Sequence, residues 1–282
     1  MTPLATPQVA ALVALACAGA LVGAVIARRR RLRALLAMPL LPEWRALLAC
    51  RVPLYARLPA TLRAQLEAPI RAFLQRVAFI GCDGLAVSDE MRLVIAAQAA
   101  LLIVNRDPRS YAGLFSVVIY PDEFVVTEED IDDIGVVTEG KRALSGQTIA
   151  TDRIVLSWRD VQERGPPGDA YNVVLHEFAH FLDHAEDGGL ASRAADGNRR
   201  TAGALARWHD VLEREYARLC AAVDGGAETL IDPYGSEDPA EFFAVATETF
   251  FELPQALRMR HPQLYAALQG FYRLDPAGWS EL

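Results

Sequence analysis

Two histidines and a glutamate near the middle of the chain form its most chemically informative pattern. His176, Glu177 and His180 follow the spacing H-E-x-x-H. On a helix this spacing places both imidazoles on one face about 6 Å apart, which suits two ligands of one zinc ion. The glutamate between them projects toward the open coordination position, where it can take a proton from metal-bound water. The pattern therefore predicts a zinc hydrolase.

A catalytic zinc site needs a third protein ligand, and the residues directly downstream do not supply one. In the metzincin pattern a glycine turns the chain so that a residue ten positions after the first histidine returns to the metal. Here Asp183 occupies the glycine position and Glu186 the ligand position, and an aspartate gives no such turn. We expect Asp183 to orient an imidazole instead, the alternative being an ordinary acid on the helix surface. His184 has rotated away from the metal direction and is predicted to lie on the surface.

A helix further along the chain carries three other candidate acids. Asp238 and Pro239 predict its start, as a cap followed by a first-turn proline. Glu241, Glu248 and Glu252 follow on the same helix. Because Glu241 and Glu248 are seven residues apart and share a face, spacing alone does not choose the ligand.

The remaining segments predict an α+β domain, mostly helical with a small mixed sheet. Apolar residues at helical spacing predict helices over residues 60–76 and 205–219. Ser88 is expected to cap a helix that runs to about residue 104, and Asp169 to cap the histidine helix. Short β-branched runs predict strands at residues 77–80, 115–120, 124–126 and 153–158.

The last of these strands has two interpretations. Residues 154–158 could form an edge strand beside the cleft, against which an extended peptide pairs by main-chain hydrogen bonds. They could equally form an ordinary buried strand, because their composition is apolar.

The first 33 residues predict a membrane anchor with a polybasic flank. Residues 9–27 are a run of 19 without a charge, and the five arginines that follow are Arg28, Arg29, Arg30, Arg31 and Arg33. At about 1.5 Å per residue, such a run just crosses a hydrocarbon layer of roughly 30 Å. The charge follows the run, which argues against a cleaved signal peptide, and no polar face indicates a surface helix. We expect a single span in the inner (cytoplasmic) membrane, with the catalytic domain in the cytoplasm.

Charge and cysteine content narrow the function further. The chain has 28 basic and 36 acidic residues. Five of the basic residues and no acid lie in residues 1–33, so the rest carries 23 against 36, a net charge of about −13. Such a surface repels phosphate backbones, and we expect no nucleic-acid partner. The four cysteines contain no C-x-x-C pair and indicate isolated thiols in a reducing compartment.

The paired motifs also resemble a known family. Residues 176–183, followed about 50 residues later by residues 232–244, are similar to the Mlc titration factor A family of zinc metallopeptidases. The resemblance covers roughly residues 40–275 and implies a zincin-like domain of gluzincin type, similar to the catalytic domain of anthrax lethal factor. Carried over by position, it implies His176, His180 and Glu241 as ligands of Zn²⁺. It also implies Glu177 as general base and Tyr234 as a tyrosine that faces the active site.

The resemblance implies a peptide or protein substrate, with aminopeptidase-like activity on small substrates. The founding member binds a glucose-responsive transcriptional repressor, so a transcriptional regulator is a further expected partner. We therefore expect a membrane anchor over residues 1–33, a connector over 34–58 and a zinc metallopeptidase domain over 59–282. The alternative is a membrane-tethered regulatory protein that sequesters a transcription factor with little or no proteolysis.

Overall fold

The computed structural model of this chain describes most of the segment that follows the expected anchor. The described residues are 22–24, 26, 27, 30, 38–107, 109–122, 124–131, 137–144, 146–150, 152–163, 169–185 and 199–279. The predicted membrane span at 9–27 and its arginine flank lie largely outside them. Within the described residues, no helix has the length and apolar character that crossing a bilayer requires.

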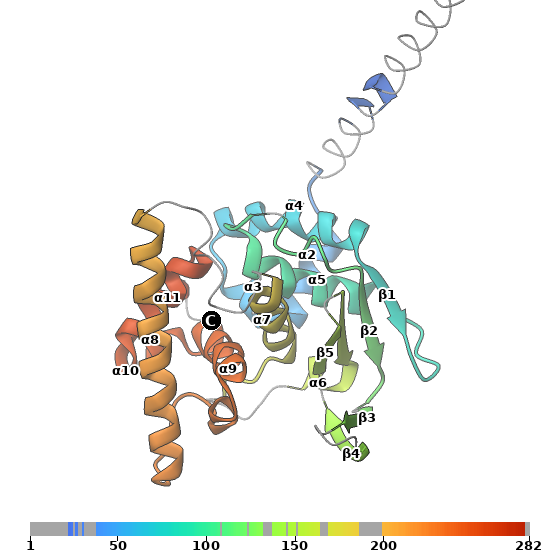
Figure 1. Cartoon of the computed structure of the whole chain (residues 1–282). Helices are drawn as coiled ribbons and strands as arrows, with labels where there is room; N and C mark the ends of the chain where they lie inside the picture. The colour runs from blue at the N-terminus through green and yellow to red at the C-terminus, as the bar shows by residue number, and fades with distance from the viewer. Residues whose placement is uncertain are drawn as a thin grey trace, which may run out of the picture.

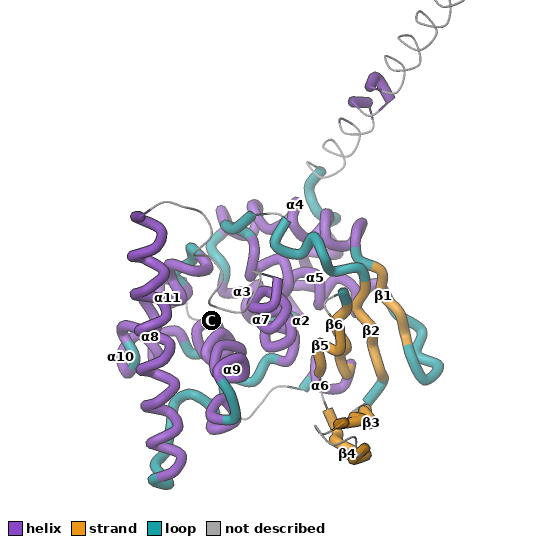
Figure 2. The backbone as a smooth tube through the Cα atoms, viewed as in Figure 1, coloured by secondary structure: helices purple, strands orange, loops and turns teal. Residues whose placement is uncertain are grey.

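The domain is mostly helical, with a small sheet at one side, which confirms the predicted α+β class (Figures 1 and 2). The helices are α2 Pro42–Arg51, α3 Pro53–Arg57, α4 Ala60–Arg76, α5 Asp89–Ile103, α6 Trp158–Gln162, α7 Val173–Ala185, α8 Arg199–Asp224, α9 Pro239–Glu252, α10 Pro254–Arg260 and α11 Pro262–Tyr272. The strands are β1 Ala78–Gly81, β2 Ser116–Tyr120, β3 Phe124–Ile131, β4 Val137–Leu144, β5 Gly146–Ala150 and β6 Arg153–Ser157. The described residues also form the short 3₁₀ helices η2 Pro233–Ser236 and η3 Pro276–Gly278.

The main sheet is mixed, with the strand order β1-β2-β6-β5. β1, β2 and β6 run parallel, and β5 pairs antiparallel with β6. β3 and β4 form a separate antiparallel pair. The strands predicted from β-branched runs are therefore present, but the edge-strand interpretation of residues 154–158 is wrong. Because β5 folds back onto β6, β6 is an interior strand and its residues 154–157 are buried.

The start of the histidine helix differs from the prediction. Asp169 Oδ1 accepts a hydrogen bond from the Tyr171 amide (3.2 Å) and so belongs to the turn before α7. Asn172 Oδ1 accepts from the Leu175 amide (3.1 Å), which is the bond that an N-cap side chain makes. The cap is therefore Asn172, and the prediction of Asp169 was wrong.

Two other predicted helix starts are confirmed. Ser88 Oγ accepts from the Met91 amide (3.2 Å) at the start of α5. Asp238 Oδ1 accepts from the amides of Ala240 (2.7 Å) and Glu241 (2.9 Å) at the start of α9. These bonds satisfy amides that have no partner inside the helix.

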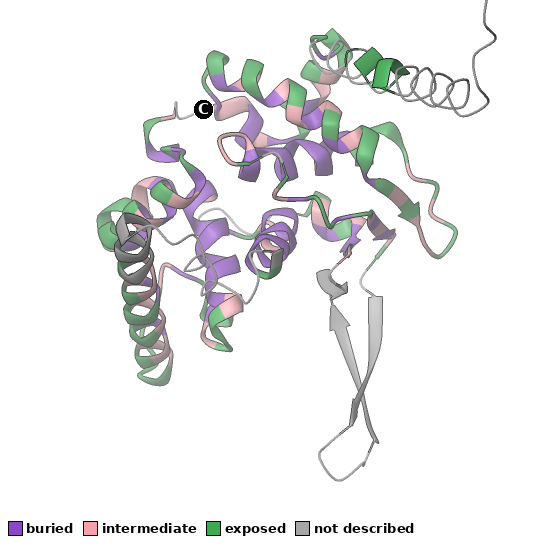
Figure 3. Cartoon of the chain, turned by 45° about the horizontal axis from the view of Figure 1, so that its top comes forward, coloured by how far each residue is buried: buried purple, intermediate pink, exposed green. Residues whose placement is uncertain are grey.

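The core lies between α5, α7 and α9, whose inner faces are buried (Figure 3). Residues 242–251 of α9 are all buried, so this helix is enclosed on nearly every side. Residues 34–58, expected to be a connector, contain α2 and α3. Leu48 and Leu54 of these helices are 0% and 1% exposed within the same core, so α2 and α3 pack as part of the domain.

Candidate metal centre

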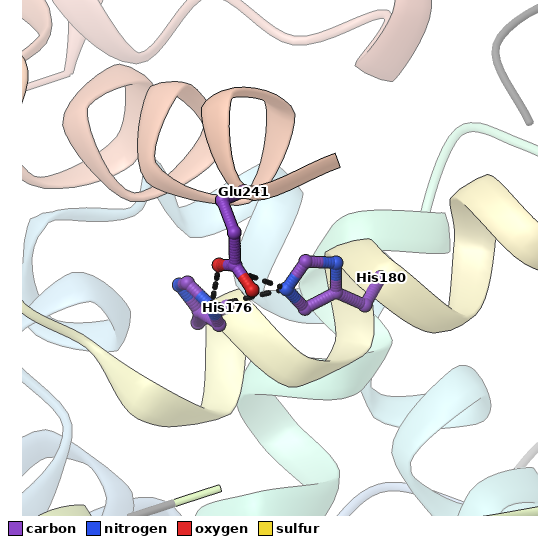
Figure 4. A group of neighbouring side chains, drawn as sticks. All are labelled: His176, His180 and Glu241. Atoms are coloured by element: carbon purple, nitrogen blue, oxygen red, sulfur yellow. Dashed lines mark hydrogen bonds and ion pairs between the residues drawn. The ribbon is translucent and has the colours of Figure 1, made fainter. Parts of the chain in front are cut away.

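The candidate metal centre lies between α7 and α9, which pack against each other (Figure 4). α7 turns its apolar face to the core through Val174, Phe178 and Leu182, which leaves His176 and His180 on the side that faces α9. Glu241 lies in the first turn of α9, where the Asp238 cap holds its backbone amide. The two histidines and Glu241, separated by about 60 residues, therefore meet at one point.

Three potential ligand atoms converge at this point. Glu241 Oε2 lies 3.0 Å from His176 Nε2 and 3.3 Å from His180 Nε2, and the two Nε2 atoms are 3.1 Å apart. Tetrahedral zinc with bonds of about 2.0–2.1 Å separates neighbouring ligand atoms by roughly 3.3 Å. Two imidazole nitrogens and one carboxylate oxygen are also a usual ligand set for catalytic zinc. Among the described residues, this is the one group of three such side chains that could hold a metal ion.

Glu248 contacts the other nitrogen of His176. Its Oε1 lies 2.8 Å from His176 Nδ1, and its side chain is almost fully buried. A carboxylate can only accept here, so Nδ1 carries the hydrogen and Nε2 is left to face Glu241 and His180. Of the two acids that spacing did not separate, Glu241 faces the ligand position and Glu248 orients the imidazole.

Burial and hydrogen bonding shift the pKa values of this group. Burial lowers the pKa of His176, but hydrogen bonds to Glu241 and Glu248 outweigh it and raise that pKa to about 10. Burial raises the pKa of Glu241, yet its hydrogen bonds to both histidines hold it well below the ordinary value. Burial raises the pKa of Glu248 above its usual range. A metal ion that binds here must displace the proton of His176.

The other predicted residues of α7 lie as follows. Glu177 is buried (4% exposed) directly beside the two histidines in the sequence. His184 is exposed, as predicted. Asp183 is buried at 8% exposure, and its expected role in orienting an imidazole stays a prediction.

Tyr234 lies on η2 beside the histidines. Its ring centroid is 6.1 Å from that of His176, and the side chain is 37% exposed, so solvent or a substrate can reach it. Asp232 Oδ1 accepts from the Tyr234 amide (2.8 Å), and the Tyr216 hydroxyl of α8 donates to the Ser236 carbonyl (3.3 Å). These contacts fix the turn that presents Tyr234.

Sequence reasoning missed two residues that support the site. Asn172 contacts Glu248, Glu252 and Gln98, and Gln98 is a buried side chain on α5. A signal for each was present: an asparagine directly before the apolar run of α7, and a single amide inside the apolar run of α5.

Comparison with known proteins identifies the family. Residues 26–273 match the family described as glucose-regulated metallo-peptidase M90. The chain belongs to this metallopeptidase family. A protein from Synechocystis sp. that is described as uncharacterized is 40% identical over 242 residues, which are 84% of this chain and 86% of that protein. Proteins named Mlc titration factor A confirm the resemblance predicted from the motifs. The protein from Pectobacterium atrosepticum is 35% identical over 238 residues, 84% of this chain and 87% of its own length. The protein from Yersinia pestis is 32% identical over 239 residues, 84% of this chain and 86% of its own length.

Membership of the M90 family makes this a metallopeptidase-type domain and implies a bound metal ion. His176, His180 and Glu241 are the described residues whose geometry fits that ion.

Proposed function

We propose that this protein is a zinc-dependent peptidase that hydrolyses peptide bonds with Glu177 as general base. The observation that carries the proposal is the convergence of His176 Nε2, His180 Nε2 and Glu241 Oε2 within 4.8 Å of one another. Membership of the M90 metallopeptidase family supports it. These three side chains would hold Zn²⁺. The bound ion would lower the pKa of a coordinated water toward about 7 and polarise a substrate carbonyl.

Glu177 and Tyr234 supply the acid–base and hydrogen-bonding groups. The Glu177 carboxylate takes a proton from the attacking water and passes it to the nitrogen of the leaving amine. Burial of Glu177 keeps bulk water from competing for that proton. The Tyr234 hydroxyl donates a hydrogen bond to the carbonyl oxygen of the substrate as negative charge develops on it. Its exposed position next to His176 leaves room for a peptide to reach it.

A peptide substrate would lie along β5. In the described part of the sheet β5 is the edge strand next to β6, and α7 packs against both. An extended peptide can pair with the open side of an edge strand by main-chain hydrogen bonds. We therefore assign to β5 the pairing with an extended peptide that was first expected for residues 154–158.

The test uses the purified full-length chain. We expect about one zinc ion per chain and cleavage of a peptide library that a chelator abolishes. Glu177→Gln should retain the zinc and lose activity by about 10²–10⁴-fold. Comparing peptides with free and acetylated amino termini distinguishes aminopeptidase from endopeptidase action. A chain that binds no zinc, or a Glu177→Gln variant with undiminished chelator-sensitive cleavage, would refute the proposal.

The names of two relatives support a second proposal, that the protein sequesters a transcriptional regulator. Both are called Mlc titration factor A, and each matches 84% of this chain. A regulator captured equally well by wild type, by Glu177→Gln and after metal removal would favour sequestration. Capture that is lost on metal removal, together with cleavage of the regulator by wild type and not by Glu177→Gln, would favour a protein substrate instead.

We also propose that residues 9–27 anchor the protein in the inner membrane, with the domain in the cytoplasm. The uncharged apolar run and the five arginines after it support this orientation. Membrane fractionation of the full chain and of a variant lacking residues 1–33 tests it. Equal recovery of both in the supernatant would contradict it.

A further inference from the structure

Asn172 uses every hydrogen-bonding group that it has. Its carbonyl accepts from the His176 amide (3.0 Å), and its Oδ1 accepts from the Leu175 amide (3.1 Å). Its backbone amide donates to Glu248 Oε2. Its Nδ2 donates to Gln98 Oε1 and to Glu252 Oε1, both at 2.8 Å. One residue thus joins α7, α9 and α5.

The hydrogen bonds of Glu248 connect Asn172 to the candidate metal ligand His176. One oxygen of Glu248 faces His176 Nδ1 (2.8 Å), and the other accepts from the Asn172 amide. The carboxylate can rotate only if one of these bonds breaks, and because Glu248 is 4% exposed, the lost bond would leave a buried oxygen without that partner. The plane of the His176 ring therefore depends on where Asn172 holds its backbone.

Arg57 of α3 contacts the end of α9, where Glu252 lies. Its Nη2 lies 3.3 Å from Glu252 Oε2 and donates to the Phe251 carbonyl (2.8 Å), and its Nη1 donates to the Glu252 carbonyl (3.2 Å). These bonds satisfy carbonyls at the end of α9 and hold Glu252 in place to receive Asn172. The contacts run from Arg57 through Glu252, Asn172 and Glu248 to His176.

We propose that Asn172 is a positioning residue for the metal site, which sets the orientation of the His176 imidazole through Glu248 and is itself anchored by the Arg57–Glu252 pair. The helix α3, part of the segment first interpreted as a connector, then helps to support the site. The proposal rests on the metal site of the proposed function. Groups bonded directly to a ligand typically change metal affinity or activity by about 10–100-fold when they are removed, and Asn172, which acts through Glu248, should have a smaller effect.

The variant Asn172→Asp removes the hydrogen-bond donors of the side chain but keeps the oxygen that caps α7. The introduced carboxylate can still accept from the Leu175 amide, but it cannot donate to Gln98 or Glu252, and it repels the Glu252 carboxylate. We expect the Kd for zinc, measured on the full-length chain by competition with a chromogenic chelator, to rise by about 3–10-fold, which is less than the loss of a direct partner of a ligand would cause. The visible absorption of the Co²⁺-loaded protein should also change, because it reports the geometry of the ligands. The circular dichroism spectrum should stay that of a folded protein.

Asn105→Asp is the matched control. Asn105 Nδ2 likewise donates a hydrogen bond, here to the backbone carbonyl of Arg273 (2.9 Å), and this bond is exposed to solvent. This variant should keep the Kd for zinc within twofold of wild type. The double variant Asn172→Asp with Glu252→Gln should recover part of the lost affinity, because the introduced amide can donate to the introduced carboxylate. Arg57→Lys should weaken zinc binding in the same direction and by less.

A folded Asn172→Asp variant with wild-type zinc affinity and an unchanged Co²⁺ spectrum would overturn the inference and leave the proposed function intact. If that variant does not fold, Asn172→Ser decides by the same criteria, because its hydroxyl preserves a cap without adding charge. If the wild-type chain itself binds no zinc, the proposed function and this inference both fail.

Discussion

His176 and Glu248 face each other across the interface of α7 and α9, with Nδ1 2.8 Å from Oε1. This contact uses the ring nitrogen that points away from Glu241 and His180. The opposite nitrogen, Nε2, is therefore fixed in direction before any ligand arrives. Glu241 is therefore a candidate metal ligand and Glu248 supports the His176 ring, although both glutamates lie on the same face of α9.

The two glutamates should differ in how strongly zinc binding depends on them. We expect Glu248→Ala to raise the Kd for zinc by about 10–100-fold, because it frees the His176 ring to turn. Glu241→Ala removes a proposed ligand and should raise the Kd by more than Glu248→Ala does. Isothermal titration of zinc into the metal-free chain measures both. Glu228→Ala, at an exposed acid, is the control, and a larger effect of Glu248→Ala than of Glu241→Ala would reverse our assignment.

The Tyr234 hydroxyl should matter for turnover and little for binding. Tyr234→Phe keeps the ring beside His176 but removes the proposed donor to the developing negative charge. We expect kcat to fall by about 10²–10³-fold, with KM and zinc content little changed. Tyr171→Phe provides a control at a similarly exposed tyrosine. A variant at Tyr234 that loses zinc would instead indicate that this residue supports the site.

Zinc uptake should release protons near neutral pH. In the metal-free protein the pKa of His176 is raised from its ordinary 6.5 to about 10, so the ring is protonated at neutral pH. Because the ion needs the unprotonated Nε2, binding displaces about one proton. Zinc affinity should therefore rise by about tenfold for each pH unit between neutrality and that pKa. Calorimetry in two buffers of different ionisation enthalpy counts the protons, and a count of zero would contradict the raised pKa.

Two glycine substitutions should have opposite effects on stability. An added Cβ at Gly235 would lie 3.2 Å from Leu219 Cδ2 and 3.4 Å from Phe242 Cα, behind the turn that carries Tyr234. Gly235→Ala should therefore lower the free energy of unfolding by about 1–3 kcal/mol. Gly270 lies within α11, and an added Cβ there would lie in open space, with no neighbouring atom within 4 Å. Gly270→Ala should therefore raise the free energy of unfolding by about 0.5–1 kcal/mol. Urea unfolding of the three proteins measures both changes, and an equally stable Gly235→Ala variant would show that the turn can shift.

Local patterns predicted the features that depend on neighbouring residues. The sequence predicted the caps at Ser88 and Asp238, the apolar faces of the helices and the β-branched strands, because each depends on residues within a few positions of one another. The meeting of α7 with the acid-bearing helix was expected from the resemblance to a family. The distinct contacts of Glu241 and Glu248 were not readable from spacing, because both share one face and only the packing of α9 on α7 separates them.

Contacts between distant segments account for the errors. The edge-strand interpretation of residues 154–158 failed because the pairing partner β5 lacks a strong β-branched run. The prediction of Asp169 as the cap failed because Asn172 is held in the cap position by Glu248, Glu252 and Gln98, which lie on segments distant in the sequence.

The apolar contact between α7 and α9 has a consequence for the order of assembly. α7 and α9 pack against each other and both contribute residues to one buried apolar core, so the two helices that carry the candidate ligands are brought together by the same burial that folds the domain. Zinc fingers, by contrast, fold only when the ion gathers their ligands. We therefore expect this chain to fold before it binds the proposed zinc ion, so that the zinc supply would determine how many folded molecules are active.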